Sequence, residues 1–420
     1  MKTPEIILPK RIAVLREQPH QDIKVKNEEF SLYFANFIHP IYPWHDIVVE
    51  CEYGKNLGHC WRINDYPADV KEFGLSIKIY DEEGCLVTEK KTVVELCDQD
   101  IDAPFRVLCI GDSMTHHMIY VSHMQNRLKN VFTCGTRSYD GHVFGEGRGG
   151  WSYDLYLNKH SLEKGERGAT KWVSPFLFPK GISGTEYFGD MEFYEASQEK
   201  NRSSCCFNGF VFSPIKEGQY YHKHGKLYKQ GEEKPVSDHV EWELNFKKYL
   251  ERNNIKNPDA VSLLFGANDL WPYSYENPSE SIDAYINNMK KFIASIKEAD
   301  KNIDVIINLP IPGSDQSGFG KVMGCSGTYK AYNYKIREGA KAILYEFEGA
   351  DGIHICPMLH AIDTQHGFDN ASIRANLYDD TQLVIKDDAV HPNPNGYRQM
   401  GDALAATVEM VRHKSLKKEN

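Results

Sequence analysis

The 420-residue chain has no uninterrupted apolar run of 18 residues, so no segment is expected to span a membrane. It also lacks a concentrated basic stretch, apart from a short terminal run at 414–418. The formal net charge is −10 at pH 7. An acidic balance opposes contact with a phosphate backbone, so we expect neither a nucleic-acid partner nor a membrane partner.

The cysteines do not form any recognisable motif. None of the ten stands in a Cys-x-x-Cys pair, which argues against a zinc ribbon and against a thioredoxin-type site. Cys109 lies within an apolar run and is predicted to be a small buried hydrophobe. Residues 1–14 lack the long apolar core of a signal peptide. Unless a leader has been removed, we therefore expect reduced thiols and a cytoplasmic location.

The chain also lacks a well-framed cofactor or metal motif. Residues 145–150 formally contain G-x-G-x-x-G, but residues 139–142 separate them from the preceding apolar stretch and no βαβ unit surrounds them. His116, His117 and His123 fall on a predicted helix, where the first two point apart and no carboxylate completes a set. We therefore expect no cofactor and no metal.

Residues 1–102 alternate apolar and polar side chains, which is the period of half-buried strands. A turn at 81–84 separates two such runs and predicts a hairpin. We predict a small β-sandwich of Ig-like outline as an accessory domain, serving as a scaffold, a sugar-binding surface or a dimer contact. The predicted strands are 47–51, 60–63, 73–79, 85–88 and 92–96.

From residue 103 to 420, strands and helices alternate, which predicts a parallel sheet with helices on both faces. Residues from about 157 to 240 break this pattern with a long polar and aromatic insertion. Such a loop is a lid, a binding surface, a local subdomain or an exposed decoration. The predicted strands are 105–110, 131–134, 261–266, 303–309 and 352–357, and the predicted helices are 114–129, 278–298, 327–347 and 395–412.

The chemistry-bearing residues begin with Gly111-Asp112-Ser113, which directly follow the strand predicted at 105–110. A serine hydroxyl is a weak nucleophile near neutral pH and needs a base. Asp388-Ala-Val-His391 lies near the other end of the chain and can present a carboxylate and an imidazole from one loop. Histidine titrates in the range that suits a base, and a carboxylate fixes its tautomer. The sequence therefore predicts a serine hydrolase with catalytic Ser113, Asp388 and His391.

Two further segments supply the oxyanion stabilisation that acyl transfer requires. Gly149-Gly150-Trp151-Ser152 follows a glycine-rich loop, and Gly266-Ala267-Asn268-Asp269 follows an apolar run. A glycine N–H and an asparagine amide can both point at one developing oxyanion. From the residues alone, either Gly149 or Gly150 is the candidate glycine.

These four segments, in this order, resemble the four sequence blocks of the SGNH/GDSL hydrolase family over residues 105 to 412. The resemblance implies a three-layer α/β/α fold around a parallel sheet, carboxylic ester hydrolysis, and no cofactor. It selects Gly150, because Trp151 and Ser152 follow it as in the family pattern. By this resemblance Ser113 is the nucleophile, Ser113, Gly150 and Asn268 form the oxyanion hole, and Asp388 and His391 complete the triad.

Aromatic residues flank these segments and indicate the substrate. Trp151 follows the chosen glycine, while Trp271 and Tyr273 follow Asn268. Their faces suit stacking on a sugar ring, although they also suit packing of the loops. No long apolar stripe for a fatty chain lies near these segments.

The resembling family includes carbohydrate O-acetyl esterases, lysophospholipases and thioesterases. Its two-domain members with an extra β-domain often resemble deacetylases of polysaccharides or oligosaccharides. We therefore expect an esterase that removes acetyl groups from an O-acetylated carbohydrate through an acyl-enzyme. The alternatives are a lysophospholipase or thioesterase of the same family, and a catalytically silent carbohydrate-binding protein.

Overall fold

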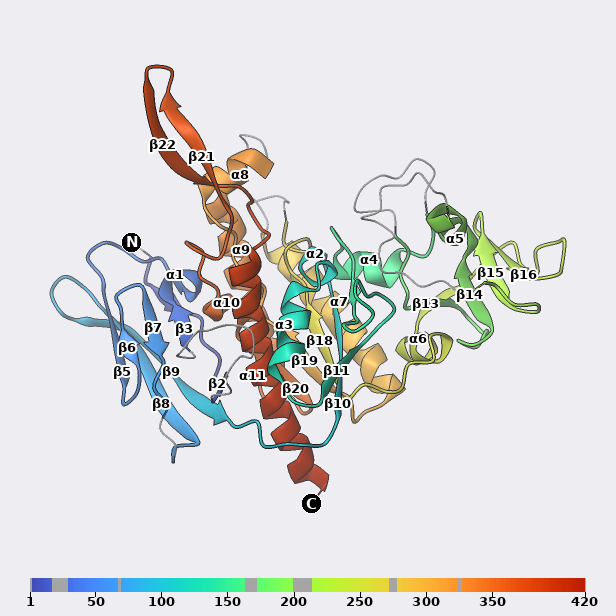
Figure 1. Cartoon of the computed structure of the whole chain (residues 1–420), viewed down its shortest axis with the longest axis horizontal. Coiled ribbons are helices and arrows are strands. Elements are labelled where there is room, and N and C mark those ends of the chain that lie inside the picture. The colour runs from blue at the N-terminus through green and yellow to red at the C-terminus, as the bar shows by residue number, and fades with distance from the viewer. Residues whose placement is uncertain are drawn as a thin grey trace.

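A central parallel sheet organises the larger part of the chain (Figure 1). The computed structural model describes residues 2–16, 29–66, 69–162, 172–198, 214–271, 278–322 and 327–419. The sheet has the strand order β11-β10-β18-β19-β20, with a short strand β12 added beside the end of β10. These strands are β10 (Phe105–Gly111), β11 (Val131–Cys134), β12 (Glu146–Gly147), β18 (Ala260–Leu264), β19 (Asp304–Asn308) and β20 (Ile353–Cys356). The predicted α/β class is confirmed.

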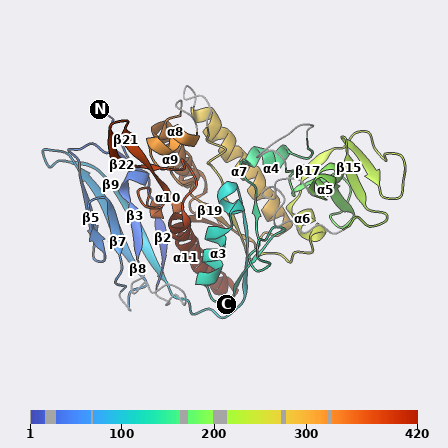
Figure 2. The same ribbon diagram turned by 45° about the horizontal axis from the view of Figure 1, so that its top comes forward.

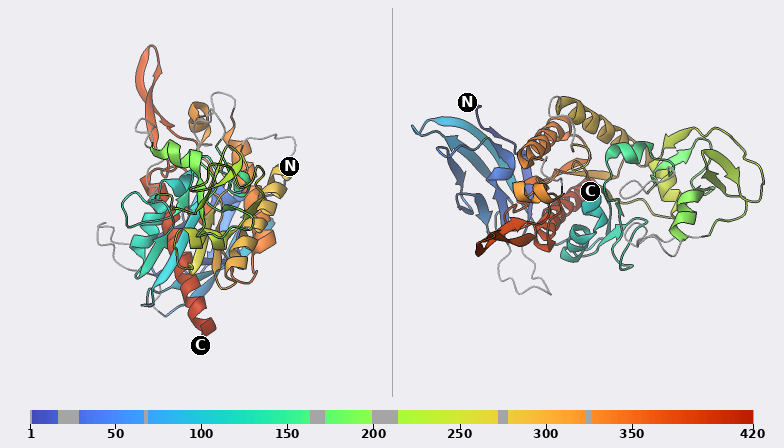
Figure 3. Two further views of the ribbon diagram at one scale, coloured as in Figure 1. Left: turned by 90° about the vertical axis from the view of Figure 1, so that its right-hand side faces the viewer. Right: turned by 90° about the horizontal axis from the view of Figure 1, so that it is seen from above.

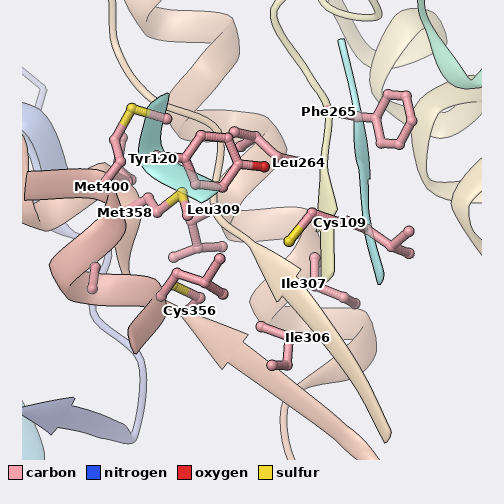
Figure 4. Close-up of a cluster of buried hydrophobic side chains, with 14 of the residues drawn as sticks. Cys109, Tyr120, Leu264, Phe265, Ile306, Ile307, Leu309, Cys356, Met358 and Met400 are labelled. Atoms are coloured by element: carbon pink, nitrogen blue, oxygen red, sulfur yellow. The ribbon is translucent and has the colours of Figure 1, made fainter. Parts of the chain in front are cut away.

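The strands of this sheet are apolar because helices cover both of its faces. Val107, Leu108, Cys109 and Ile110 of β10 are all fully buried. Figure 4 shows Cys109 among aliphatic and sulfur-containing side chains of the neighbouring strands and helices. The prediction that Cys109 is a small buried hydrophobe is confirmed.

Two helix layers enclose the sheet. On one face α3 (Ile119–Arg127) packs against the long C-terminal helix α11 (Pro394–Glu419), and on the other α7 (Pro278–Ala299) packs against α9 (Tyr329–Phe347) (Figures 1 and 3). These helices agree with the predicted 278–298, 327–347 and 395–412 segments to within a few residues, except that α11 runs seven residues further.

The helix predicted at 114–129 is wrong in one respect, because the chain breaks it in two. A single turn, α2 (Ser113–His116), is followed by Met118 in the left-handed conformation, with φ of 58°. Met118 is buried, so packing holds a backbone conformation that side chains larger than glycine rarely adopt. The turn that carries Ser113 is therefore separate from α3, which begins after Met118.

The N-terminal region is rich in sheet, as predicted. The predicted hairpin is present, but its second half is one long strand rather than two short ones. Trp61 and Phe73 approach with ring centroids 6.4 Å apart and bring the two sheets together. One sheet has the order β2 (Arg11–Leu15), β9 (Leu86–Cys97), β8 (Glu72–Tyr80) and β5 (Asp46–Cys51), and the other β3 (Phe30–Tyr33), β7 (Cys60–Ile63) and β6 (Lys55–Asn56).

The N-terminal region packs closely on the rest of the chain, beside α10 (Met358–Ala361) and α11 (Figure 2). Asn36 is buried and donates from Nδ2 to the carbonyl groups of Leu359 at 2.9 Å and Ile362 at 2.8 Å. His360 Nε2 in turn lies 2.8 Å from the carbonyl oxygen of Ile7. The division of the chain near residue 102 stays a prediction, and these bonds cross it.

The described part of the insertion forms a local subdomain at the opposite end of the molecule from the N-terminal region (Figure 1). A short pair joins β13 (Leu177–Pro179) to β17 (Trp242–Leu244). Beyond it, a three-stranded sheet packs with one helix, α5 (Met191–Gln198). The strands of that sheet are β14 (Tyr187–Asp190), β15 (Tyr220–Lys223) and β16 (Lys226–Lys229).

Two further findings concern the outside of the molecule. A two-stranded hairpin, β21 (Asn370–Asn376) and β22 (Asp379–Lys386), projects from the body and leads directly toward Asp388 (Figure 1). The sequence did not indicate it.

Within the described residues, the helices do not combine the length and hydrophobicity that a membrane crossing requires.

Replacing Asn36 with alanine should destabilise the fold, because two buried carbonyl groups would lose their donor. We expect the free energy of unfolding to fall by roughly 2–4 kcal/mol. Asn56→Ala is the matched control, since Asn56 also donates to a carbonyl but at an exposed position, and should cost less than about 1 kcal/mol. Urea unfolding followed by circular dichroism measures both, and equal losses would show that the Asn36 contacts are unimportant.

Candidate active site

Ser113 opens α2 directly after the carboxyl end of β10. Asp112 caps this turn, because its side chain accepts a hydrogen bond from the Met114 N–H at 3.0 Å. The Ser113 N–H belongs to the first turn, where backbone donors have no acceptor within the helix. A Cβ on Gly111 would lie 2.2 Å from Thr115 Oγ1, so this tight turn requires glycine. The local sequence therefore presents both the hydroxyl and the N–H of Ser113 at the edge of the sheet.

The three predicted catalytic residues lie in one hydrogen-bonded chain. His391 Nε2 lies 2.8 Å from Ser113 Oγ, although 278 positions separate the two residues in sequence. His391 Nδ1 lies 3.1 Å from Asp388 Oδ2. The other oxygen of Asp388 accepts hydrogen bonds from the backbone N–H groups of Val390 at 2.8 Å and His391 at 2.9 Å. The Asp-x-x-His loop thus folds around its own carboxylate and fixes the imidazole beside the serine.

These contacts set the charges of the Asp388–His391 pair. Burial raises the pKa of Asp388, but the hydrogen bonds from His391 and from two backbone N–H groups outweigh it and lower the pKa to about 2. Burial lowers the pKa of His391, but the hydrogen bond and negative charge of Asp388, with the charge of Asp112, raise it overall. Asp388 is therefore ionised, and His391 is a stronger base than an isolated histidine.

The loop after β18 brings Asn268 toward the second predicted block. Asp269 is partly buried and accepts hydrogen bonds from the N–H groups of Tyr153 at 2.8 Å and Gly266 at 3.2 Å. Asn268 donates from Nδ2 to the carbonyl oxygen of Trp151 at 2.9 Å. Its other amide N–H makes no hydrogen bond within the described part of the chain. Two contacts from adjacent residues therefore tie this loop to the segment that follows Gly150.

Gly150 lies in a tight turn that the structure closes by a hydrogen bond from the Trp151 N–H to the Arg148 carbonyl at 3.2 Å. Its φ of 74° lies in the left-handed region and suits the third position of a type II turn, where glycine is favoured. The φ of Gly149 is not in that region. The glycine chosen from the sequence is thus the one whose backbone needs to be glycine.

A buried ion pair lies beneath this turn. Arg148 donates to Glu146 Oε2 at 2.8 Å, and both side chains are almost completely buried. The other oxygen of Glu146 accepts hydrogen bonds from the Thr136 N–H at 3.0 Å and the Tyr249 hydroxyl at 2.8 Å. The Tyr156 hydroxyl bonds to the carbonyl oxygen of Glu146 at 2.7 Å. A charge buried in this way is tolerated because each partner is hydrogen-bonded.

The histidines of the nucleophile turn diverge, as their adjacency predicted. His116 turns inward, with Nε2 3.1 Å from the Tyr139 hydroxyl and Nδ1 bonded to buried Arg137. Burial and the charge of Arg137 lower the pKa of His116 to about 3. The His117 ring instead stands edge-on to His391, with centroids 5.7 Å apart. In the described residues, no three His, Cys, Asp or Glu side chains gather as metal ligands would.

The predicted substrate aromatics have three different outcomes. The side chain of Trp151 is fully buried and packs against Tyr156 and the Arg148 guanidinium, so it cannot offer a face to a sugar, and that prediction is wrong. Trp271 is partly buried and stacks on Phe319 with ring centroids 5.7 Å apart. Tyr273 lies outside the described residues.

Several residues of the site were missed at the sequence level. Asp112, Asp269 and the Glu146–Arg148 pair lie within or beside the four motif segments, but no role was predicted for them. A charged side chain next to a buried strand is the signal that could have marked them. His117 had no such signal, because only the fold brings it against His391.

Comparisons with known proteins agree with the family resemblance. Residues 235–404, which include Asn268, Asp388 and His391, match the model of the family described as GDSL-like Lipase/Acylhydrolase. No curated protein matches the chain.

Similar solved structures include three esterases. A carbohydrate esterase family 3 protein from Talaromyces cellulolyticus has 13% identity and a TM-score of 0.36, covering 74% of this chain and 99% of its own. A family 3 carbohydrate esterase from Clostridium thermocellum has 13% identity and a TM-score of 0.34, covering 74% and 100%. A carbohydrate acetylesterase from Sinorhizobium meliloti has 14% identity and a TM-score of 0.33, covering 72% and 98%.

The family match falls on the part of the chain that supplies the predicted third and fourth blocks. Over these residues the match confirms the resemblance stated from the sequence, and it supports a carboxylic ester hydrolase.

Proposed function

We propose that this hydrolase is a serine esterase that works through an acyl-enzyme, with Ser113 as nucleophile, His391 as base and Asp388 as the residue that orients the base. The observation that carries the proposal is the pair of hydrogen bonds from Asp388 through His391 to Ser113, at 3.1 and 2.8 Å. A base at hydrogen-bonding distance makes a serine hydroxyl nucleophilic. A carboxylate on Nδ1 keeps that proton in place and leaves Nε2 free to accept the serine proton.

The reaction then follows from the positions of these groups. Ser113 Oγ attacks the ester carbonyl carbon while His391 Nε2 takes the hydroxyl proton. His391 returns this proton to the leaving alcohol as the carbon–oxygen bond breaks, which leaves an acyl group on Ser113. Water repeats the sequence with the same base and releases the carboxylic acid. Asp388 stays ionised throughout, in keeping with its low pKa.

The negative charge on the carbonyl oxygen needs donors that are already in place. We assign this role to the backbone N–H groups of Ser113 and Gly150 and to the side-chain amide of Asn268. The first-turn position of Ser113, the left-handed turn at Gly150 and the remaining amide N–H of Asn268 support the assignment. The bond from Asn268 to the Trp151 carbonyl fixes the amide beside Gly150.

The surroundings of the base favour a polar leaving alcohol. A cavity of about 530 Å³ begins at His117, whose ring contacts His391. Its lining is rich in hydrogen-bonding side chains, which suit the hydroxyl groups of a sugar better than an acyl chain of a lipid. The polar members of the lining are His117, Ser122, His123, Asn126, Tyr139, Asp140 and Arg398.

We therefore propose an acetylated carbohydrate as substrate. Trp271 follows the Asn268 loop and keeps part of its ring exposed, so it can offer an apolar face to a pyranose. The exposed Tyr139 ring on the rim of the polar cavity offers a second face. A short acyl group needs little room beyond the oxyanion donors, whereas the sugar supplies most of the binding energy.

Ser113→Ala should retain the fold and lose nearly all turnover, because no other group can form the acyl-enzyme. We expect kcat for an aryl acetate to fall by about 10⁴-fold or more. Mass spectrometry after treatment of the wild type with a fluorophosphonate should place one adduct on Ser113. An adduct elsewhere, or an active Ser113→Ala variant, contradicts the assignment.

Asp388→Asn should lower kcat by about 10²–10⁴-fold, because the amide cannot hold the imidazolium. Asp387→Asn is the matched control, since it removes an adjacent carboxylate that lies outside the hydrogen-bonded chain to Ser113.

The pH profile gives the same test a second readout. Activity should fall on the acid side as His391 gains a proton. Because the pKa of His391 is raised, the midpoint of this fall should lie at a pH above the usual pKa of histidine. Losing the Asp388 charge should move the limb to lower pH. A limb that stays in place in Asp388→Asn would mean that another group titrates.

A series of acyl esters tests the substrate. We expect acetyl esters to be hydrolysed faster than butyryl, octanoyl or palmitoyl esters, and acetylated xylan or mannan fragments to be better substrates than an aryl acetate. Trp271→Ala should raise KM for the acetylated fragment more than for the aryl ester. Trp151→Ala should not raise one KM more than the other, because the Trp151 side chain is buried. Faster turnover of octanoyl or longer esters, or no release of acetate from any sugar, would favour the lipid or thioester alternative.

A further inference from the structure

A second cavity, separate from the one beside the base, lies between the insertion and the parallel-sheet body. Its volume is about 470 Å³, within the range of roughly 300–1,000 Å³ that is typical of small-molecule sites. On one side it is walled by β14 and α5 of the insertion, and on the other by the segment that follows α6 (Phe246–Arg252) and by the Gly135–Thr136 segment. No role in ester hydrolysis has been given to these walls above.

The cavity contains an arginine without a carboxylate partner. Arg252 is partly buried and donates from Nη2 to the carbonyl oxygen of Pro175 at 2.9 Å, which is a neutral acceptor. Among the described residues, no carboxylate forms an ion pair with it. The charge of Glu146 acts on Arg252 from a distance, but that carboxylate is bound by Arg148 at 2.8 Å. Desolvation lowers the pKa of Arg252, as expected for a cation that has left water without a counter-charge.

The lining carboxylate, Asp190, does not neutralise this cation. One of its oxygens accepts from the Phe193 N–H at 2.5 Å, and the other, Oδ2, is buried without a hydrogen-bond partner. Asp190 Oδ2 lies 3.3 Å from Nδ1 of fully buried His222, which has no hydrogen bond on either ring nitrogen. Burial raises the pKa of Asp190 to about 7, so this carboxyl group carries its negative charge less readily than an exposed aspartate does. Lys216 at the same cavity adds a second positive charge.

Rings form much of the remaining wall. Tyr187, Phe188, Phe193 and Tyr194 line it, and the Arg252 guanidinium lies over the Tyr187 ring at 5.9 Å from its centroid. The His160 ring also reaches the cavity, with a buried Nδ1 that has no hydrogen-bond partner. A guanidinium binds a carboxylate with two parallel hydrogen bonds, and aromatic faces bind the C–H face of a sugar ring.

We propose that this cavity is a second binding site, for a uronic-acid unit, in which Arg252 binds the sugar carboxylate and the aromatic wall binds the sugar ring. The choice of a sugar rests on the proposed carbohydrate substrate of the catalytic site, whereas the choice of an anion rests on unpaired Arg252. The site would hold an acidic oligosaccharide on the enzyme at a second point, away from Ser113.

Titration calorimetry on the wild-type full chain tests the site with four unacetylated sugars. Glucuronate and galacturonate should bind, whereas glucose and galactose, which lack only the carboxylate, should bind far more weakly. Arg252→Gln should weaken uronate binding by roughly 10- to 100-fold, the loss of a charge-assisted pair. The matched control is Arg374→Gln, which removes the same charge from an exposed pair with Asp380 on the β21–β22 hairpin and should bind as the wild type does.

A second variant keeps the test decisive if Arg252→Gln does not fold. Phe188→Ala removes a partly exposed ring from the wall without changing any charge and should weaken uronate binding as well. A circular dichroism spectrum and a melting temperature equal to those of the wild type show that each variant is folded.

Three results would overturn the proposal. Neutral sugars that bind as tightly as uronates would remove the role of Arg252. Acetate that displaces uronate at equal affinity would mark a site for any small anion. Absence of binding by all four sugars would show that the cavity does not recognise monosaccharides. Because none of the probes is an ester, these results do not depend on whether the proposed esterase activity is correct.

Discussion

The carbonyl group of Gly111 joins the loops on which the candidate active site depends. Its oxygen accepts a hydrogen bond from the Arg148 N–H at 3.0 Å and lies 2.9 Å from the Tyr156 hydroxyl, whose one proton it shares with the Glu146 carbonyl oxygen. A side chain at Gly111 would collide with Thr115 and with the Leu264 carbonyl, so the strand ends, α2 and the Gly150 loop meet at one peptide unit. The separation of Ser113 from Gly150 is thus held by a backbone hydrogen bond and by the buried side chain of Tyr156.

Around this point three carboxyl groups are buried or partly buried at the apolar edge of the sheet. Desolvation raises the pKa of both Asp112 and Asp269 to about 7, and each is held by backbone N–H donors. Glu146 is held differently, by Arg148 and two hydroxyl groups. Groups of this kind do not contribute much net stability, but their fixed hydrogen-bond geometry gives three loops one arrangement. That rigidity suits donors which must be in place before charge develops on a substrate.

The two appended regions contribute in different ways. The N-terminal sheets bind the catalytic body through buried hydrogen bonds such as those of Asn36, at the end far from the insertion. The insertion and its flanks reach the elements around Gly150 and Ser113, because Tyr249 of α6 bonds to Glu146 and the Trp172 ring stands edge-on to His116 at 5.7 Å. Arg148 lines the second cavity, and its carbonyl group closes the Gly150 turn, so this residue links the cavity to that turn.

The sequence by itself determined the sheet strands and the four motif loops, because buried parallel strands are continuous apolar runs and the motif residues directly follow them. It could not determine which side chains are buried. Trp151 adjoins a catalytic motif as Trp271 does, yet only the packing against Arg148 and Tyr156 encloses it. It also could not determine the break at Met118, since tertiary packing holds that left-handed residue against its local preference. Contacts between residues remote in sequence, such as His117 with His391, Glu146 with Tyr249 and the unpaired Arg252 in its aromatic cavity, arise only when the whole chain is folded. The spacing of apolar residues predicts a single helix or strand, whereas the distances between helices and strands depend on how all of them pack.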